Sequence, residues 1–275
     1  MEKITDWNSL WRELVEITSR SHERRADAKA DIWAGRATEF KQGVQSRWAR
    51  PDSSREFVCS CVGADSTVLD IGAGTGAWAL LLARRARRVT AVEPSAAMIE
   101  VMRQDLAAAS VDNVAIVQGE WPEVSVEPHD FSLCSHAMYG CPDLAAFVRQ
   151  MVACTRQMCF LLLRAPRIDG VRAEAARHVW GHPLDSPNFT IAYNVLLQMG
   201  IYANVQLEDT GRWRPRTSAS LDEALRDLKR YTDVSETDEH DGFFLDLLRR
   251  RLELKDGRWA WPPDVTSALV YWKPG

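Results

Sequence analysis

The sequence predicts an α/β protein built on a mostly parallel sheet with helices on both faces. Short apolar runs alternate with helical segments from residue 67 to residue 163. Strands that are buried on both faces and joined by helices form parallel sheets with right-handed crossovers. A glycine-rich turn at residues 72–76 follows the first of these runs and precedes a helical segment. Such a turn places backbone N–H groups and a helix start beside a ligand.

The spacing of apolar residues predicts the individual elements. Within residues 3–48 they recur at helical spacing in two pieces, before a break at Pro51. Beyond residue 164 we expect an extra helix and loop at 164–187, a helix that ends at Gly200, and a capping box at Ser220. The acidic segment 232–242 predicts a mobile loop. Strands are expected at 67–71, 89–92, 114–117, 131–135, 158–163, 202–210 and 266–275, and helices at 76–86, 95–109, 142–156, 188–200 and 220–231.

The length, composition and charge limit the class of protein to which this chain can belong. The chain has 275 residues, enough for one large domain, and its 46% hydrophobic and 26% charged residues are typical of soluble globular proteins. No apolar run is long enough to cross a bilayer, and the charged N-terminus lacks the apolar core of a signal peptide, so we expect a cytoplasmic protein without a membrane partner. A net charge of -4 gives no strong field for nucleic acid. The six cysteines lack zinc-ligand spacing, and we expect no metal.

The glycine turn alone leaves two cofactors open. Residues 72–77 satisfy the pattern GxGxxG/A, and the acid Glu93 closes the next apolar run, where a ribose-binding acid belongs. This arrangement suits the pyrophosphate and ribose of a dinucleotide. It equally suits S-adenosylmethionine, whose methionyl and ribose portions lie across such a loop. A tight turn with packing glycines is the structural alternative.

Four stretches together resemble the motifs of class I S-adenosylmethionine-dependent methyltransferases. They are "VLDIGAGTG", "VTAVEPSAAMIE", "VAIVQGEWPEV" and "HDFSLCSHAMYGCPDLAAFVRQ", in register over about residues 33–160. The resemblance implies a Rossmann-like, seven-stranded, mostly parallel sheet with an antiparallel last strand. It also implies an N-terminal helical cap or lid at residues 1–50 and a methyltransferase core at 51–275, with helical insertions near 165–187 and 211–260.

The same resemblance implies which residues hold S-adenosylmethionine and its product S-adenosylhomocysteine. Gly72, Ala73 and Gly74 would line the methionyl and ribose part, and Asp70 would orient the loop or the amino group. Glu93, followed by Pro94, would accept the ribose hydroxyls, and Glu120 or Trp121 would meet the adenine. Ser135 would face the methionine moiety. Trp33 and Phe40 fall in a segment that covers the cofactor, where Phe40 replaces the usual tyrosine.

The acceptor is inferred from the segment "SHAMYG", residues 135–140. Relatives that methylate nucleobase or glutamine amino groups carry an Asn/Asp-Pro-Pro-aromatic motif here, and its absence favours a small-molecule acceptor over nucleic acid. We expect His136 and Tyr139 to be catalytic, because an imidazole has a suitable ordinary pKa, about 6.5, for a general base. A histidine that only shapes the site is the alternative. Further acceptor candidates are His178, Trp180, His182, Tyr193 and Arg212.

Three other functions compete with this reading. A methyltransferase that modifies protein and a non-catalytic module that binds S-adenosylmethionine both fit the motifs. A nicotinamide-dependent oxidoreductase fits the glycine turn, but we find no catalytic Lys or Tyr-Lys pair for it. The segment 164–187 either closes over the site as a lid or packs as an extra helix.

Overall fold

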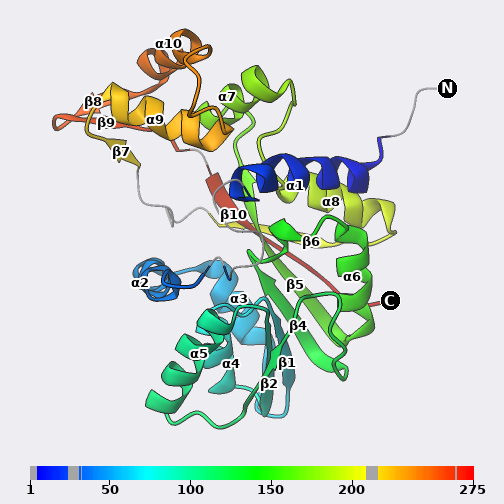
Figure 1. The fold of residues 1–275 in the computed structure, drawn as a ribbon. Helices are drawn as coiled ribbons and strands as arrows, with labels where there is room; N and C mark the ends of the chain where they lie inside the picture. Colours follow the sequence, from blue (N-terminus) through cyan, green and yellow to red (C-terminus); the bar gives the residue numbers. More distant parts are fainter. Residues whose placement is uncertain (1–4, 24–30, 32, 209–215, 264) are drawn as a thin grey trace.

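The computed structural model describes residues 5–23, 31, 33–208, 216–263 and 265–275 (Figure 1). Its centre is one seven-stranded sheet, and a smaller lobe of helices and short strands lies beyond one end of this sheet. Within the described part of the chain, no helix is both long and apolar enough to cross a membrane.

The sheet has the strand order β3-β2-β1-β4-β5-β10-β6 and confirms the predicted fold class. Strand β10 pairs antiparallel with both β5 and β6, whereas β1 to β5 are mutually parallel. The order reverses between β1 and β4, and ligands of open α/β sheets bind at such a switch point, beyond the carboxyl ends of the strands. The strands are β1 Thr67–Ile71, β2 Arg88–Glu93, β3 Val114–Gln118, β4 His129–Ser135, β5 Thr155–Pro166, β6 Asn204–Glu208 and β10 Val265–Trp272.

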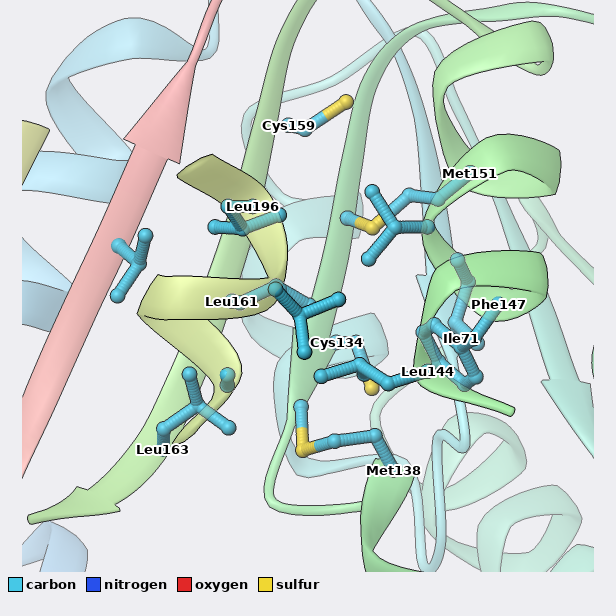
Figure 2. Close-up of a cluster of buried hydrophobic side chains, with 14 of the residues drawn as sticks. Ile71, Cys134, Met138, Leu144, Phe147, Met151, Cys159, Leu161, Leu163 and Leu196 are labelled. Carbon is cyan, nitrogen blue, oxygen red and sulfur yellow. The ribbon is translucent and has the colours of Figure 1, made fainter. Parts of the chain in front are cut away.

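Helices cover the two faces of the sheet, because successive strand residues point to opposite sides. Leu161 of β5 belongs to one apolar cluster and Leu162 to the other. Figure 2 shows part of the first cluster, where Leu161 of β5 lies beside Leu196 of α8, and Ile71 of β1 lies beside Phe147 of α6. That face carries α1 Trp7–Glu23, α6 Leu144–Ala153 and α8 Phe189–Gln198, and the other carries α3 Ser53–Cys61, α4 Ala77–Ala83 and α5 Ala96–Ala108.

The two N-terminal helices lie in different places. Helix α1 packs into the core, where Trp11 is fully buried and its indole N–H donates to the Cys141 carbonyl at 2.8 Å. Helix α2, Ala37–Trp48, instead lies against α5, to which Lys41 is tied by an ion pair with Asp105 at 2.5 Å. Only α2 therefore borders the carboxyl ends of β1 and β2.

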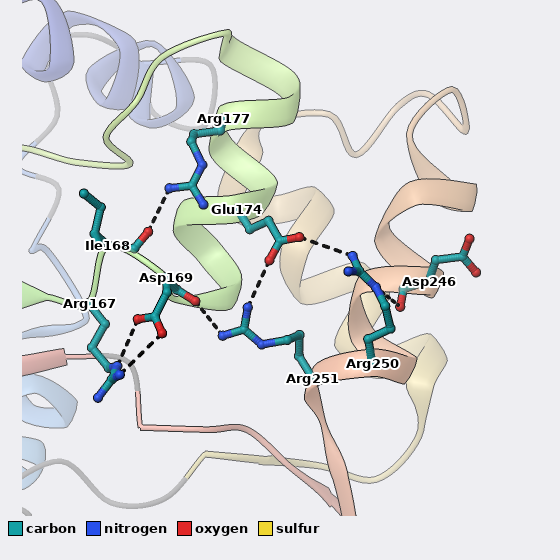
Figure 3. Close-up of polar contacts among 8 residues, drawn as sticks. All are labelled: Arg167, Ile168, Asp169, Glu174, Arg177, Asp246, Arg250 and Arg251. Carbon is teal, nitrogen blue, oxygen red and sulfur yellow. Dashed lines mark hydrogen bonds and ion pairs between the residues drawn. The ribbon is translucent and has the colours of Figure 1, made fainter.

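The smaller lobe has its own apolar core, which includes Leu228, Phe244 and Trp261. Ion pairs join two of its helices (Figure 3). The carboxylate of Glu174 in α7 pairs with Arg250 and Arg251 at the end of α10, at 3.2 and 3.0 Å. Its elements are α7 Val171–Trp180, α9 Leu221–Thr232, α10 Asp241–Arg251 and the three-stranded sheet of β7 Thr217–Ser218, β9 Arg258–Ala260 and β8 Glu253–Lys255. Helix α10 begins inside the acidic segment for which the sequence predicts a loop.

Candidate active site

A cleft of about 590 Å³ lies at the carboxyl ends of β1, β2 and β4, where the strand order reverses. Its walls come from the loops after β1, β2, β3 and β4 and from one face of α2. Every residue that the sequence predicts for the cofactor or the chemistry lines this cleft: Trp33, Phe40, Asp70, Gly72, Ala73, Gly74, Glu93, Pro94, Glu120, Trp121, Ser135, His136 and Tyr139.

The glycine turn brings the loops after β1 and β4 together. Gly72 has a left-handed backbone with φ of +69°, and a Cβ there would lie 2.2 Å from the Cβ of Ala137. The N–H groups of Gly72 and Ala73 both donate to the Val92 carbonyl, at 2.9 and 3.0 Å, which fixes the turn beside β2. Only glycine permits this contact, so the residues after β4 lie directly against the turn.

Glu93 is a buried carboxylate that holds the turn from the end of β2. Its Oε2 accepts the N–H of Gly74 at 2.7 Å, and its Oε1 accepts the N–H of Ser95 at 2.9 Å. Burial, followed by the repulsion of Asp31, raises the pKa of Glu93, although these two N–H groups oppose the shift. Each carboxylate oxygen can accept more than one hydrogen bond, so Glu93 can also bind hydroxyl groups of a ligand.

Asp70 is 1% exposed, and its Oδ2 has no hydrogen-bond partner among the described residues. Burial, and then repulsion by Glu93, raises the pKa of Asp70 to about 7, although the N–H of Ala79 opposes the shift. Buried polar atoms are almost always paired in folded proteins. An unpaired carboxylate oxygen that lines a cleft therefore indicates a ligand with a cation or hydrogen-bond donor.

Aromatic rings from the turn before α2 and from α2 itself cover the glycine turn. The rings of Trp33 and Phe40 meet edge to face at 5.0 Å, and Phe40 lies 3.7 Å from the position that a Cβ of Gly74 would take. The segment is held by Asp31, which accepts the hydroxyl of Ser95 and so links it to the residues after Glu93. Burial would raise the pKa of Asp31, but the hydrogen bonds from Ser95, Ala97 and Trp33 lower it.

Trp121 is a buried residue that also lines the cleft. Its indole N–H donates to the Phe147 carbonyl at 3.2 Å, and its ring packs against that of Phe147 at 6.2 Å. The polar edge of the indole is therefore already bonded, and a ligand in the cleft would meet its apolar surface. Glu120, the neighbouring residue, is exposed.

His136 follows β4 in a left-handed backbone conformation with φ of +59°, and its N–H donates to the Leu162 carbonyl at 3.0 Å. Its Nδ1 lies 3.1 Å from the hydroxyl of Tyr139, and its Nε2 lies 3.5 Å from that of Ser267. The Tyr139 hydroxyl also accepts the backbone N–H of Arg164 at 2.6 Å. Burial raises the pKa of Tyr139, so its phenol stays protonated at neutral pH and orients His136.

The other acceptor candidates among the described residues do not line the cleft. Their rings and polar atoms have partners elsewhere: His178 stacks on Phe243, Trp180 donates to Thr232, His182 bonds to Leu184, and Tyr193 donates to Ala203. Arg212 lies outside the described residues. Conversely, sequence reasoning missed Val44, Arg47 and Trp48 of α2, which do line the cleft.

The cleft holds more acidic than basic side chains. Asp70, Glu93 and Glu120 line it together with Arg47, the one arginine or lysine among its described lining residues. Such a lining favours a ligand with positive charge. No group of three or more His, Cys, Asp or Glu side chains in the described part of the chain is arranged to hold a metal ion.

Solved structures with the same sheet define the fold class. The YcgJ protein from Bacillus subtilis is 16% identical, with a TM-score of 0.54, over 81% of this chain and 99% of that one. A proposed methyltransferase from Bacillus halodurans C-125 is 15% identical, with a TM-score of 0.52, over 76% and 92%. The [4+2]-cyclase SpnF is 11% identical, with a TM-score of 0.52, over 80% of each chain. These similarities establish the fold.

The sequence also matches a protein-family model over part of its length. Residues 68–158, which span β1 to the start of β5, match the family model described as a methyltransferase domain. This part of the chain is thus similar to the class I S-adenosylmethionine-dependent methyltransferases. S-adenosylmethionine is their methyl donor and the cofactor of this site. No curated protein matches the sequence.

Proposed function

We propose that this protein transfers a methyl group from S-adenosylmethionine to a small-molecule acceptor. The observation that carries this proposal is the pair of buried carboxylates, Asp70 and Glu93, at the glycine turn. Glu93 fixes the turn and keeps acceptor capacity, and Asp70 has an unpaired oxygen. A cofactor with ribose hydroxyls, an ammonium group and a sulfonium group would satisfy both.

The residues of the cleft fit that cofactor in order. Gly72, Ala73 and Gly74 would lie along the methionyl and ribose parts, because the two glycines carry no side chain of their own. Glu93, beside Pro94, would accept the ribose hydroxyls, and Asp70 would face the amino group. Glu120 and Trp121 would contact the adenine, and Ser135 would contact the methionine moiety. Trp33 and Phe40 would cover the bound cofactor.

S-adenosylmethionine supplies a methyl group that is already electrophilic, because it is bonded to a sulfonium. The protein has to align the acceptor, exclude water and manage any proton. Orientation alone lowers barriers by about 7–11 kcal/mol in favourable intramolecular models. We assign His136 as the side chain that contacts the acceptor, and Tyr139 as the residue that orients His136.

Two observations support a small acceptor. The cleft is bounded by α2 on the side away from the sheet, where Trp33 and Phe40 cover the glycine turn. The loop after β4 is "SHAMYG", without the motif of the nucleobase-modifying relatives, and the net charge is -4. We therefore expect no nucleic-acid partner. Of the proposed N-terminal cap, 1–50, the part from residue 31 to residue 48 would do the covering.

Calorimetry and turnover together test the proposal. We expect S-adenosylhomocysteine to bind in the micromolar range and NAD not to bind, and binding of NAD alone would overturn the cofactor assignment. Formation of S-adenosylhomocysteine is then measured with panels of small molecules, peptides and nucleic acids. Turnover only with peptides would replace the small-molecule acceptor by a protein.

Cofactor binding without turnover on any panel would favour a non-catalytic module. That outcome has to be tested because one fold serves unrelated chemistries, as the similarity to a [4+2]-cyclase illustrates.

A further inference from the structure

A second hollow lies beneath α2, where this helix faces α4, and has a volume of about 230 Å³. One stripe of each helix lines it, with residues spaced i, i+3, i+4 and i+7, which all lie on one face of a helix. The two faces point toward each other across an open groove, which we call the α2–α4 groove. Its lining comprises Lys41, Val44, Gln45 and Trp48 from α2, Ala77, Leu80, Leu81 and Arg84 from α4 and its C-cap, and Thr75, Gly76 and Asp105.

Helix α2 is held on both sides of this groove. Near its start, the ammonium group of Lys41 pairs with Asp105 of α5 at 2.5 Å. At its end, the ring of Trp48 meets that of Trp78 in α4 edge to face at 5.2 Å, and the guanidinium carbon of Arg55 lies 4.9 Å from the centre of the Trp48 ring. These contacts keep α2 at a distance from α4, so the groove between them stays open.

The groove combines an apolar lining with one positive charge that has no partner. Leu80 and Leu81 are half-buried, so part of their apolar surface stays open to the groove. Lys41 and Asp105 neutralise each other, whereas the guanidinium of Arg84 is exposed and has no partner among the described residues. A carboxylate matches a guanidinium with two parallel hydrogen bonds, and an apolar body would cover the leucines. The lining therefore suits a small molecule with one acidic group and an apolar remainder.

The groove and the cofactor cleft share a wall. Val44, Trp48, Thr75 and Ala77 line both of them, and Phe40 of the same helix covers the glycine turn. A ligand in the groove and a cofactor in the cleft would therefore contact opposite sides of α2. A ligand that fills the groove supports α2 in the position in which it covers the cofactor, so each ligand should raise the affinity of the other.

We propose that the α2–α4 groove is a second ligand site, which takes a small apolar monocarboxylate and strengthens cofactor binding through α2. The site is separate from the acceptor and does not depend on the acceptor's chemistry. A volume of 230 Å³ equals that of about seven or eight waters, at about 30 Å³ each in the liquid. Hexanoate is of this size, and its carboxylate would pair with Arg84.

The first test locates the site. Hexanoate is titrated calorimetrically into the free protein, and hexanamide serves as its uncharged counterpart. We expect the acid to bind at least about tenfold more tightly than the amide, and Arg84→Gln to remove the difference. Arg87→Gln is the matched control, because Arg87 is equally exposed but does not line the groove, and it should bind hexanoate as the wild type does. Equal affinities for acid and amide, or tight binding of hexanoate to Arg84→Gln, contradict the proposal.

The second test measures the coupling through α2. S-adenosylhomocysteine is titrated with and without saturating hexanoate, and we expect its affinity to rise about fivefold in the wild type and not in Arg84→Gln. Hexanoate should gain the same factor in protein saturated with S-adenosylhomocysteine, because coupling is reciprocal. Gln45→Trp, which places a ring in the groove from α2, should lose hexanoate but still bind S-adenosylhomocysteine. An unchanged or weakened cofactor affinity contradicts the coupling. Failure of S-adenosylhomocysteine itself to bind would instead contradict the cofactor assignment, and the first test would still decide whether the groove is a site.

Discussion

The buried carboxyl group of Asp70 should destabilise the free protein above neutral pH. Its pKa is raised from 3.8 to about 7, chiefly by burial. Below pH 3.8 the group is neutral in both the folded and the unfolded chain, so it has no effect. As the pH rises toward 7, the unfolded chain loses the proton first, and the unfolded state is favoured. The shift of about 3 pKa units corresponds to about 4 kcal/mol, fully present above pH 7.

Asp70→Asn removes this ionisation and keeps the shape. An amide oxygen can still accept the N–H of Ala79, and the amide NH₂ group replaces the unpaired oxygen. In urea titrations we expect the variant to be more stable than the wild type at about pH 8, by up to about 4 kcal/mol, with the gain fading toward about pH 4. A difference that does not change with pH, or a less stable variant at high pH, would refute the reasoning.

The carboxylate of Asp70, which destabilises the free protein, should stabilise the bound cofactor. If Asp70 ionises when it meets the amino group of S-adenosylhomocysteine, binding near pH 7 releases a proton. Calorimetry in two buffers of different ionisation enthalpy measures that release directly. We expect it in the wild type and not in Asp70→Asn, whose affinity should fall about tenfold or more, the free energy of one lost charged hydrogen bond. Equal proton release in both proteins would place the titrating group elsewhere.

Three substitutions test the rest of the cleft. Glu93→Gln turns one N–H acceptor into a donor, so affinity for S-adenosylhomocysteine should fall about tenfold or more; unchanged calorimetry would remove Glu93 from the site. Phe40→Ala uncovers Gly74 and should weaken binding about tenfold at nearly constant stability, whereas Phe40→Tyr should not. An Ala variant that binds normally would make Phe40 a packing residue. Gly72→Ala places a Cβ 2.2 Å from that of Ala137, and should lower the unfolding free energy by about 2 kcal/mol or more; a wild-type urea midpoint would contradict this.

The strands were predictable from sequence because a buried parallel strand is a short, continuous apolar run. Helix α3 was not, since Pro51 and the following "DSS" indicate a turn. In the structure Asp52 is the N-cap of α3, and its side chain accepts the N–H of Arg55 at 2.9 Å. Asp and Ser favour both turns and helix starts, because their side chains bond nearby backbone N–H groups in either case. Only the packing of Val58 and Cys59 against the sheet separates the two outcomes.

Some residues of the candidate site could likewise be predicted from the sequence, and others could not. Residues of the glycine turn and the acid after β2 are close in sequence to a strand end, so a motif identifies them. Arg47 is not, because it lines the cleft only through the docking of α2, and a charged residue in a polar helix has no local signature. The partners of His136 are more distant still, since Ser267 lies 131 positions away. Tertiary pairing of this kind has no period or spacing that a single sequence reveals.

The strained features of the cleft argue for a ligand rather than for packing alone. A left-handed backbone at a residue such as His136 costs about 1–2 kcal/mol, and an unpaired buried carboxylate oxygen costs more. A purely structural Asp70 would be expected to have both oxygens bonded, as Glu93 does. Both unfavourable features border the same cleft, within reach of the same glycine turn. Proteins retain such local costs where function requires them, so the unpaired oxygen of Asp70 and the constrained His136 are the two positions at which cofactor and acceptor should be sought.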